Sequence, residues 1–401
     1  MYEPDGRIME KKRYLRCHRG IPKRKLRMPA KDASEANNYP LMSPRFWHGM
    51  QSRVWFPELA RNRFSFSWSR LPLALGVSCF MPASDCMALT QHLLFGRAIA
   101  ATKLAGPPLF VLGHWRSGTT LLHELLALDT KYASPTTFEC FAPSHFLLTE
   151  GLVTRFGGWL LPDKRPMDNM KAGWALPQED EFALMNLGAP TPYLRMLFPR
   201  NEIPYENTLD SRGFTVEELA KWKFLLNWFL KAVTYKSGKP LVIKSPPHTG
   251  RLGILKDMYP DAKFVHIVRD PRKLFPSTMK LWRSLDTVQG LQVGENEPRL
   301  RKFVFDSLRT MYRSFDEDRK GIPSNQLVEV KYEDLVRDPV GVVRGIYQDL
   351  EMPDFETIEP QIQSKMQQEK DYKTNRFSSD NQEEAVILQE WREYATKYGY
   401  V

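Results

Sequence analysis

The sequence has few cysteines, and none of them shows the paired spacing of a metal site. Its four cysteines, Cys17, Cys79, Cys86 and Cys140, are scattered along the chain. Such usage is typical of a reducing compartment without structural disulfides, although Cys79 and Cys86 could pair in an oxidising one. We therefore expect no metal centre and no disulfide framework.

Long hydrophobic runs are also missing. The longest, residues 71–81, contains Pro72 and is followed soon after by Asp85, whereas a membrane-spanning helix needs about 20 apolar residues. A basic stretch rather than an apolar one follows the first residues, so no signal peptide is expected. The expectation is a cytoplasmic protein with no transmembrane segment.

The body of the chain lacks a strong charge of one sign. Lys and Arg outnumber Asp and Glu by 57 to 47, but residues 1–31 alone hold eleven basic and three acidic residues. The high isoelectric point is therefore no argument for nucleic-acid binding. We expect residues 1–45 to form a basic, disordered tail and residues 46–401, with ample apolar content for a core, to form a single domain.

The stretch with the clearest chemistry runs from an apolar segment, Leu109–Leu112, through Gly113–Thr120 into the apolar residues 121–128. A buried strand, a tight glycine-bounded turn and a helix aim free backbone N–H groups and the positive end of a helix dipole at one point. The pattern predicts an anion-binding cradle.

One position of this cradle departs from the nucleotide-binding phosphate loop. Gly113 and Gly118 have the required spacing, but Thr119 stands where the lysine that reaches the outer phosphates is found. A kinase or ATPase needs that lysine and usually Mg²⁺. Here the cation comes earlier, at Arg116, which argues against a transferable triphosphate.

Strand-like and helix-like segments alternate on both sides of the cradle. The expected strands are 109–112, 240–244, 263–268 and 326–330, and the segments between them have helical periodicity. Near-continuous apolar strands joined by helices predict an α/β fold with a doubly wound parallel sheet covered on both faces.

Residues 129–239 interrupt this alternation and are expected to form a largely helical insertion on the acceptor side. Thr215 and Glu218 form a capping box that opens a helix ending at Gly238, and a short helix is expected over 178–187. The acids Glu179, Asp180 and Glu181 are interpreted as favouring the start of that helix. A further helix is expected near 88–102.

Three of the strands end in polar clusters: Gly113–Thr120, then Lys244–His248, then Arg269–Arg272. The carboxyl ends of parallel strands lie at one edge of a sheet, where ligands bind. Arg116, Lys244 and Arg269 should therefore surround the cradle, with Ser277 facing the same edge. Such a site suits a ligand with more than one anionic group.

The Arg-Ser-Gly-Thr-Thr loop, followed by Arg269-Asp-Pro-Arg with a serine eight residues on, resembles the sulfotransferases that use 3′-phosphoadenosine 5′-phosphosulfate (PAPS). The similarity is closer to the bacterial branch related to tyrosylprotein sulfotransferases than to the cytosolic phenol and steroid enzymes, and it spans roughly residues 108–401. It implies metal-independent transfer of a sulfuryl group to a hydroxyl of a small molecule, glycan or peptide tyrosine, without nucleic acid.

The resemblance also implies roles for individual residues. The 5′-phosphosulfate would lie on the loop residues Arg116, Ser117, Gly118, Thr119 and Thr120, and the 3′-phosphate on Arg269 and Ser277. Lys244 would stabilise the bridging oxygen of the leaving group. The remaining nucleotide contacts would come from Tyr332, Lys373 and Asn375.

Two residues are candidates for the general base that removes the acceptor proton. Glu139 lies near the position at which the tyrosylprotein enzymes carry their glutamate, and His248 follows Lys244 by four residues at the same edge. Two other functions stay open: a phosphate-loop kinase with a displaced lysine, and a nucleotide-binding protein without activity. The sequence does not predict the acceptor or the oligomeric state.

Overall fold

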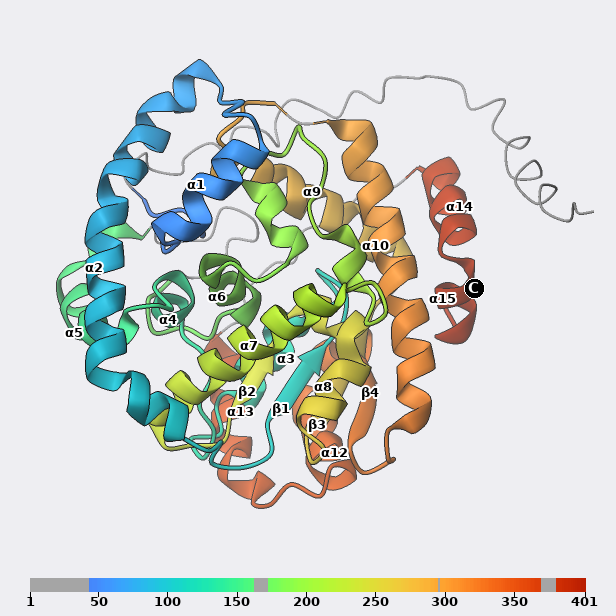
Figure 1. Ribbon diagram of the computed structural model, residues 1–401. Coiled ribbons are helices and arrows are strands. Elements are labelled where there is room, and N and C mark those ends of the chain that lie inside the picture. Colours follow the sequence, from blue (N-terminus) through green and yellow to red (C-terminus); the bar gives the residue numbers. More distant parts are fainter. Residues whose placement is uncertain (1–42, 162–171, 295, 369–379) are drawn as a thin grey trace, which may run out of the picture.

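The computed structural model describes residues 43–161, 172–294, 296–368 and 380–401 and contains the expected parallel sheet (Figure 1). Its strands are β1 (Leu109–Leu112), β2 (Val242–Lys244), β3 (Lys263–Val268) and β4 (Leu327–Lys331), in the order β2-β1-β3-β4. All three pairings are parallel, with Phe110 opposite Ile243 and Phe264. The predicted fold class is confirmed.

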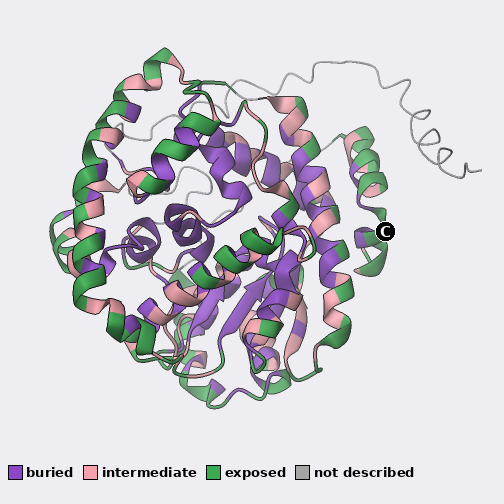
Figure 2. Ribbon diagram, in the orientation of Figure 1, coloured by how far each residue is buried: buried purple, intermediate pink, exposed green. Residues whose placement is uncertain are grey.

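Both faces of the sheet are buried, which explains why its strands are apolar at successive positions. On one face, Phe110, Ile243 and Phe264 belong to a large core that includes α7 (Val216–Ser237) and α10 (Glu297–Asp318). On the other, Val111 and Ile267 pack with apolar residues of α3 (Thr119–Leu126) and α12 (Pro339–Asp349). Buried residues accordingly concentrate around the strands in Figure 2.

Helices cross between the strands as expected. Between β2 and β3 lie η5 (Pro246–Arg251) and α8 (Leu252–Met258), and between β3 and β4 lie α9 (Pro271–Gln289), α10 and η6 (Arg319–Gly321). After β4 come α11 (Tyr332–Arg337), α12, η7 (Phe355–Thr357) and α13 (Glu359–Gln368). The last helical segment of the chain is divided in two at Trp391, into α14 (Asn381–Glu390) and α15 (Arg392–Lys397). The buried Trp391 ring contacts Phe275 and Phe305, so packing decides the break.

The insertion is helical, as predicted. It contains α4 (Thr137–Phe141), α5 (Phe146–Phe156), η2 (Gly158–Leu160), α6 (Asp180–Leu187), η3 (Pro192–Met196), η4 (Glu206–Leu209) and α7. The capping box of Thr215 and Glu218 is present, and Gly238 ends α7 in the left-handed region with φ 66°.

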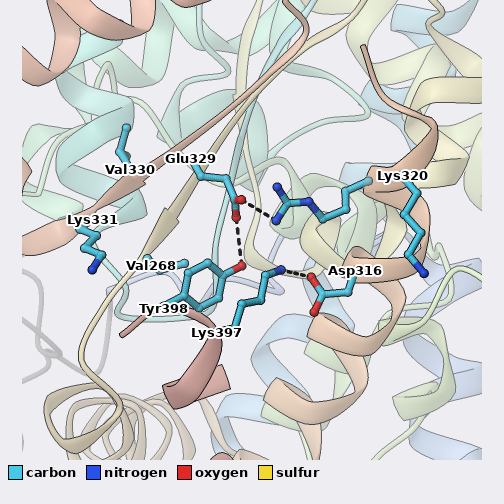
Figure 3. Close-up of a pocket in the computed structure, with 9 residues that line it drawn as sticks. Val268, Asp316, Lys320, Glu329, Val330, Lys331, Lys397 and Tyr398 are labelled. Atoms are coloured by element: carbon cyan, nitrogen blue, oxygen red, sulfur yellow. Dashed lines mark hydrogen bonds and ion pairs between the residues drawn. The ribbon is translucent and has the colours of Figure 1, made fainter. Parts of the chain in front are cut away.

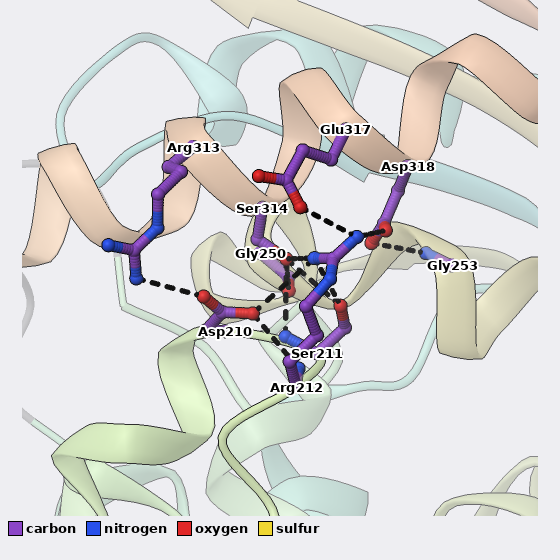
Figure 4. Close-up of polar contacts among 9 residues, drawn as sticks. All are labelled: Asp210, Ser211, Arg212, Gly250, Gly253, Arg313, Ser314, Glu317 and Asp318. Atoms are coloured by element: carbon purple, nitrogen blue, oxygen red, sulfur yellow. Dashed lines mark hydrogen bonds and ion pairs between the residues drawn. The ribbon is translucent and has the colours of Figure 1, made fainter. Parts of the chain in front are cut away.

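A polar network attaches the insertion to α10 (Figure 4). The Arg212 guanidinium contacts Asp318 at 2.8 Å and Glu317 at 3.0 Å, and Arg313 contacts Asp210 at 3.0 Å. The Asp318 carboxylate also accepts a hydrogen bond from the backbone N–H of Gly253, at the start of α8. The insertion and the sheet-covering helices are therefore joined at this point.

The N-terminal part of the described chain contains α1 (Ser52–Arg61), η1 (Trp68–Arg70) and the long α2 (Leu71–Ala101). The helix expected from Ala88 therefore begins at Leu71, because Pro72 occupies its first turn, where proline is tolerated. Cys79 and Cys86 are free and two helical turns apart. The rise between them is about 10.5 Å, too far for the pairing considered above.

Of the helices in the described ranges, the segment Trp68–Ala101 is the one that is long and apolar enough to cross a membrane. Length and composition alone are weak evidence, because core helices of soluble proteins satisfy the same criterion. The absence of a transmembrane segment stays a prediction. Most of the expected tail lies outside the described residues, but Ser43 and Arg45 are buried and belong to the folded part.

Candidate functional site

The loop between β1 and α3 adopts the geometry of an anion cradle. Gly113 and Gly118 have φ values of 146° and 107°, which favour glycine. A Cβ atom at Gly118 would lie 2.4 Å from Cδ2 of Tyr332, and one at Gly113 would lie 2.6 Å from the carbonyl oxygen of Ile267. The close approach of neighbouring chains and the backbone angles both require glycine at these positions.

The N-terminus of α3 faces this loop without a capping side chain, because its N-cap residue is Gly118. Its first amides are left to bind an anion. Ser117 is buried, and its Oγ has no hydrogen-bond partner within the described part of the chain. Arg116 has a φ of 69°, an unusual value for a residue with a side chain, which is characteristic of a functional turn.

Arg116 and Ser277 lie together, as the sequence predicts. The Arg116 Nε donates to the Ser277 Oγ at 3.1 Å, and the Arg116 carbonyl accepts from an Nη of Arg269 at 2.9 Å. The next hydroxyl of α9, Thr278 Oγ1, donates to the carbonyl of Trp115 at 3.0 Å. Two guanidinium groups and a hydroxyl are thereby held at the rim of the cradle.

Aromatic side chains hold Arg269 in place. Its guanidinium carbon lies 4.3 Å from the centre of the Tyr332 ring, and the Tyr394 hydroxyl bonds to both its backbone N–H and its carbonyl. Burial lowers the pKa of Arg269, and the neighbouring Arg116 lowers it further. Two cations this close together create a strong attraction for an anion.

Lys244 ends β2 with its side chain almost fully buried, 2% exposed. Its Nζ is 2.7 Å from Oε1 of Glu179, and the Tyr193 hydroxyl donates to Oε2 of the same carboxylate at 2.6 Å. The Trp115 indole in turn donates to the Tyr193 hydroxyl at 2.8 Å. A continuous chain of hydrogen bonds thus joins the cradle loop to the lysine.

Three successive acids at the start of α6 each contact a different basic residue at the end of β2 or in η5. Glu179 contacts Lys244, Asp180 contacts His248 at 2.8 Å, and Glu181 contacts Arg251 at 2.9 Å. The sequence interpretation of these acids as helix-start residues is right about their place in α6 but missed the pairing. Only the tertiary fold brings the two segments together, so no local pattern in either could have identified it.

Comparison with known proteins agrees with this geometry. Residues 107–357 match the Sulfotransferase family. The chain is 39% identical over 354 residues, 88% of its length, to the omega-hydroxy-beta-dihydromenaquinone-9 sulfotransferase Stf3 of Mycobacterium bovis and of Mycobacterium tuberculosis, covering 91% of each. The chain belongs to the sulfotransferase family.

Solved sulfotransferase structures share the fold. The crystal structure of STF1 from Mycobacterium tuberculosis aligns over 90% of this chain and 97% of that chain with a TM-score of 0.61 and 15% identity. That of STF9 from Mycobacterium avium aligns over 87% and 96% with a TM-score of 0.61 and 18% identity. These structures confirm the expected fold. The family match and the 39% identical relatives confirm the expected family and show that the activity of this enzyme is sulfotransfer.

The two predicted general bases of this sulfotransferase lie in different surroundings. His248 is fully buried between the rings of Phe110 and Trp222, with its Nε2 on Asp180. Glu139 is also buried, as the third residue of α4. It completes a capping box with Thr136, and its Oε1 contacts Lys236 at 2.8 Å.

Within the described residues Glu179 forms an ion pair with Lys244, whereas Glu139 pairs with Lys236 and His248 with Asp180. The assignments of Glu139 and His248 as bases stay predictions. Lys373 and Asn375, expected at the nucleotide, lie outside the described residues.

This sulfotransferase also has a hollow of about 590 Å³ near the ends of β3 and β4 (Figure 3). Arg319 pairs there with Glu329, Lys397 pairs with Asp316, and the Tyr398 hydroxyl donates to Glu329. Lys320 and Lys331 also line the hollow, so its basic residues outnumber its acids. None of the cradle residues Arg116, Arg269 and Ser277 is among the residues that line it.

Proposed function

We propose that this sulfotransferase takes its sulfuryl group from PAPS. The observation that carries the proposal is the pair of arginines at the cradle rim: Arg116 donates to the Ser277 hydroxyl, and Arg269 donates to the carbonyl of Arg116. A nucleotide with anionic groups at both its 5′ and its 3′ positions matches two adjacent cationic positions, one on the loop and one beside it.

In this proposal different residues bind different parts of the nucleotide. Arg116, Ser117, Gly118, Thr119 and Thr120 bind the 5′-phosphosulfate through the loop amides, the hydroxyls and the start of α3. Arg269 and Ser277 bind the 3′-phosphate. Tyr332, packed between Gly118 and the Arg269 guanidinium, offers a ring surface beside the nucleotide.

The proposed reaction is a direct transfer. The acceptor hydroxyl oxygen forms a bond to sulfur while the bond from sulfur to the bridging phosphate oxygen breaks, and the electron pair stays on the leaving phosphate. Lys244 stabilises the charge that develops on that oxygen. Glu179, 2.7 Å from Lys244, is placed to accept the acceptor proton in the same step.

We further infer that the acceptor is a hydroxyl on an isoprenoid quinone or a similar apolar small molecule. Support comes from the 39% identity, over most of both chains, to an enzyme named for sulfating an omega-hydroxylated dihydromenaquinone. The glycan and peptide-tyrosine acceptors that the sequence left open have no such support.

Calorimetric titration with adenosine 3′,5′-bisphosphate tests the donor site. Arg269→Ala should weaken binding 10-fold or more, because it removes one of the two guanidinium groups. The matched control is Arg272→Ala. Arg272 forms a bidentate pair with Asp270 through its Nε and an Nη, so its replacement should leave binding within about twofold.

Transfer of radioactive sulfate from PAPS to an omega-hydroxylated menaquinone then tests the reaction itself. Bisphosphate binding without transfer to any hydroxyl acceptor would favour a protein without activity. Protection from thermal unfolding by Mg²⁺-ATP, and none by the bisphosphate, would favour a kinase instead.

A further inference from the structure

The outer face of α2 carries large apolar side chains that the fold leaves uncovered. Its buried stripe, which includes Ala74, Val77, Met81 and Ala88, faces the domain. The opposite side exposes Leu75, Phe80, Leu89, Leu93 and Leu94, with Leu93 at 73% exposure. Only 28% of the most apolar window of this helix is buried. A surface helix normally carries charged residues on such a face.

Neighbouring segments extend this apolar character. α5 lies beside α2 at the same edge of the molecule (Figure 1), and the backbone N–H of Leu147 donates to the Gln91 side chain. α5 and η2 expose Leu152, Phe156 and Trp159, and η1 exposes Trp68 at 89%. We call the exposed apolar side chains of η1, α2, α5 and η2 the α2–α5 surface.

The charged residues around the α2–α5 surface are predominantly basic. In α5 the acid Glu150 pairs with Lys236, and Arg155 is the other charged residue. Residues 46–106 contain six basic residues, Arg53, Arg61, Arg63, Arg70, Arg97 and Lys103, but only two acids, Glu58 and Asp85. Glu58 is buried, and Asp85 turns inward to accept a hydrogen bond from the backbone N–H of Ser52. Between Arg70 and Arg97 the outward side of α2 therefore carries no charged residue.

We propose that the α2–α5 surface docks on the surface of an anionic lipid bilayer. Exposed tryptophans, an uncharged apolar helix face and basic residues at both ends of that helix are the combination that binds at the boundary between headgroups and acyl chains. A second protein chain could also cover the apolar residues. Binding to a protein, however, does not call for the combination of mostly basic charge and exposed tryptophans, which is typical of a membrane interface.

The packing of α2 decides between lying on a membrane and crossing it. The helix is attached to α1 through the hydrogen bond from the Trp55 indole to Ser78, and to α5 through Gln91. If the helix crossed a bilayer, the side chains of its buried stripe would lose their contacts with the core of the domain. The helix therefore docks with its axis along the membrane surface.

This docking does not rest on the proposed acceptor, but it explains how an apolar acceptor would be reached. The hydroxyl of a lipid acceptor is presented at the headgroup region, where a docked enzyme meets it. An enzyme that uses a water-soluble acceptor gains nothing from the same contact.

Sedimentation of the full chain with vesicles of phosphatidylglycerol and phosphatidylethanolamine tests the proposal. The wild type should bind these vesicles, and more weakly at high salt. Leu89→Glu with Leu93→Glu should weaken binding at least 10-fold. The matched control adds two carboxylates at exposed valines of α11 and α14, Val336→Glu and Val386→Glu, and should bind as the wild type does.

A fluorophore on Cys79 reports which face binds. Cys17→Ser with Cys86→Ser leaves the exposed Cys79 and the buried Cys140. An environment-sensitive dye at Cys79 should brighten on addition of the vesicles. No vesicle binding by the wild type, or an unchanged dye signal on binding, would overturn the proposal. So would light scattering that shows a dimer which Leu89→Glu with Leu93→Glu dissociates, without vesicle binding.

Activity separates this inference from the proposed function. Leu89→Glu with Leu93→Glu should keep wild-type transfer to an acceptor dissolved in detergent and lose 10-fold or more with the same acceptor in vesicles. If the wild type transfers no sulfuryl group in either preparation, the proposed acceptor is contradicted. The membrane docking is then tested by the sedimentation experiment alone.

Discussion

Glu179 illustrates how little a single residue's chemistry can be identified from its sequence neighbourhood. Its place in an acidic helix start has an adequate local explanation, and nothing nearby in the sequence announces Lys244. The cradle residues behave differently, because glycines, hydroxyls and an arginine in fixed order between a strand and a helix form a local unit. Sequence reasoning therefore predicted the tight turn between β1 and α3, whose role as an anion site stays a prediction, and missed the contact between Glu179 and Lys244.

Replacing each candidate carboxylate by its amide separates the two glutamates. Glu179→Gln should lower kcat by about 100-fold or more, the usual scale for loss of a general base, while the dissociation constant of adenosine 3′,5′-bisphosphate changes little. Glu139→Gln should leave kcat within about threefold and lower the melting temperature, because Glu139 pairs with Lys236 and caps α4. Activity assays at saturating donor measure kcat, and thermal unfolding measures the melting temperature. A large loss of kcat in Glu139→Gln with little change in Glu179→Gln would instead identify Glu139 as the general base.

At the scale of elements, the strands and their parallel arrangement followed from general rules, since apolar runs that end in polar clusters predict a parallel sheet and its ligand edge. The strand order was not predicted. The helix α2 did not follow from such rules either. Its apolar residues surround the helix almost evenly, so it shows no clear amphipathic period, and Pro72 and Pro82 suggested interruptions. Tertiary contacts with α1, α5 and α7 override these local signals.

The junction of β1 and α3 gives a prediction for an element rather than a side chain. Gly118→Ala should abolish measurable bisphosphate binding and destabilise the protein by about 1–3 kcal/mol, because φ is 107° and the new Cβ would meet Tyr332 at 2.4 Å. Gly345→Ala in α12 is the control: its Cβ meets nothing within 4 Å, and it should stabilise by about 0.5–1 kcal/mol. Urea unfolding and calorimetric titration measure the two effects. Wild-type affinity in Gly118→Ala would show that the loop is not the phosphate site.

Across the whole molecule, the balance of charge is uneven in a way that composition alone hides. The tail accounts for most of the net charge of +10, yet residues 46–106 form a second basic region without an exposed acid. The sequence predicted a nearly neutral body because it counts residues without regard to which face they occupy. Only the three-dimensional arrangement separates the inward acids from the outward bases.

Histidine burial is another property of the whole fold. Burial lowers the pKa of His114 and of His123 to about 3, and that of His48 and of His145 to about 4. Below pH 6.5 the histidines of the unfolded chain, with a pKa near 6.5, therefore bind protons that the same histidines do not bind in the folded chain. Stability from these groups is therefore complete above pH 6.5 and is lost as the pH falls from there toward the folded values.

Each such histidine should lower the free energy of unfolding by about 1 kcal/mol when the pH is lowered from 6.5 to 5.5. His123→Gln should reduce that loss by about 1 kcal/mol relative to the wild type, whatever the variant's stability at neutral pH. His92→Gln, which changes an exposed histidine of α2, should leave it unchanged. Urea unfolding at the two pH values gives the difference directly. A pH dependence of His123→Gln parallel to that of the wild type would mean that His123 takes up its proton within the folded protein, so that its burial does not oppose protonation.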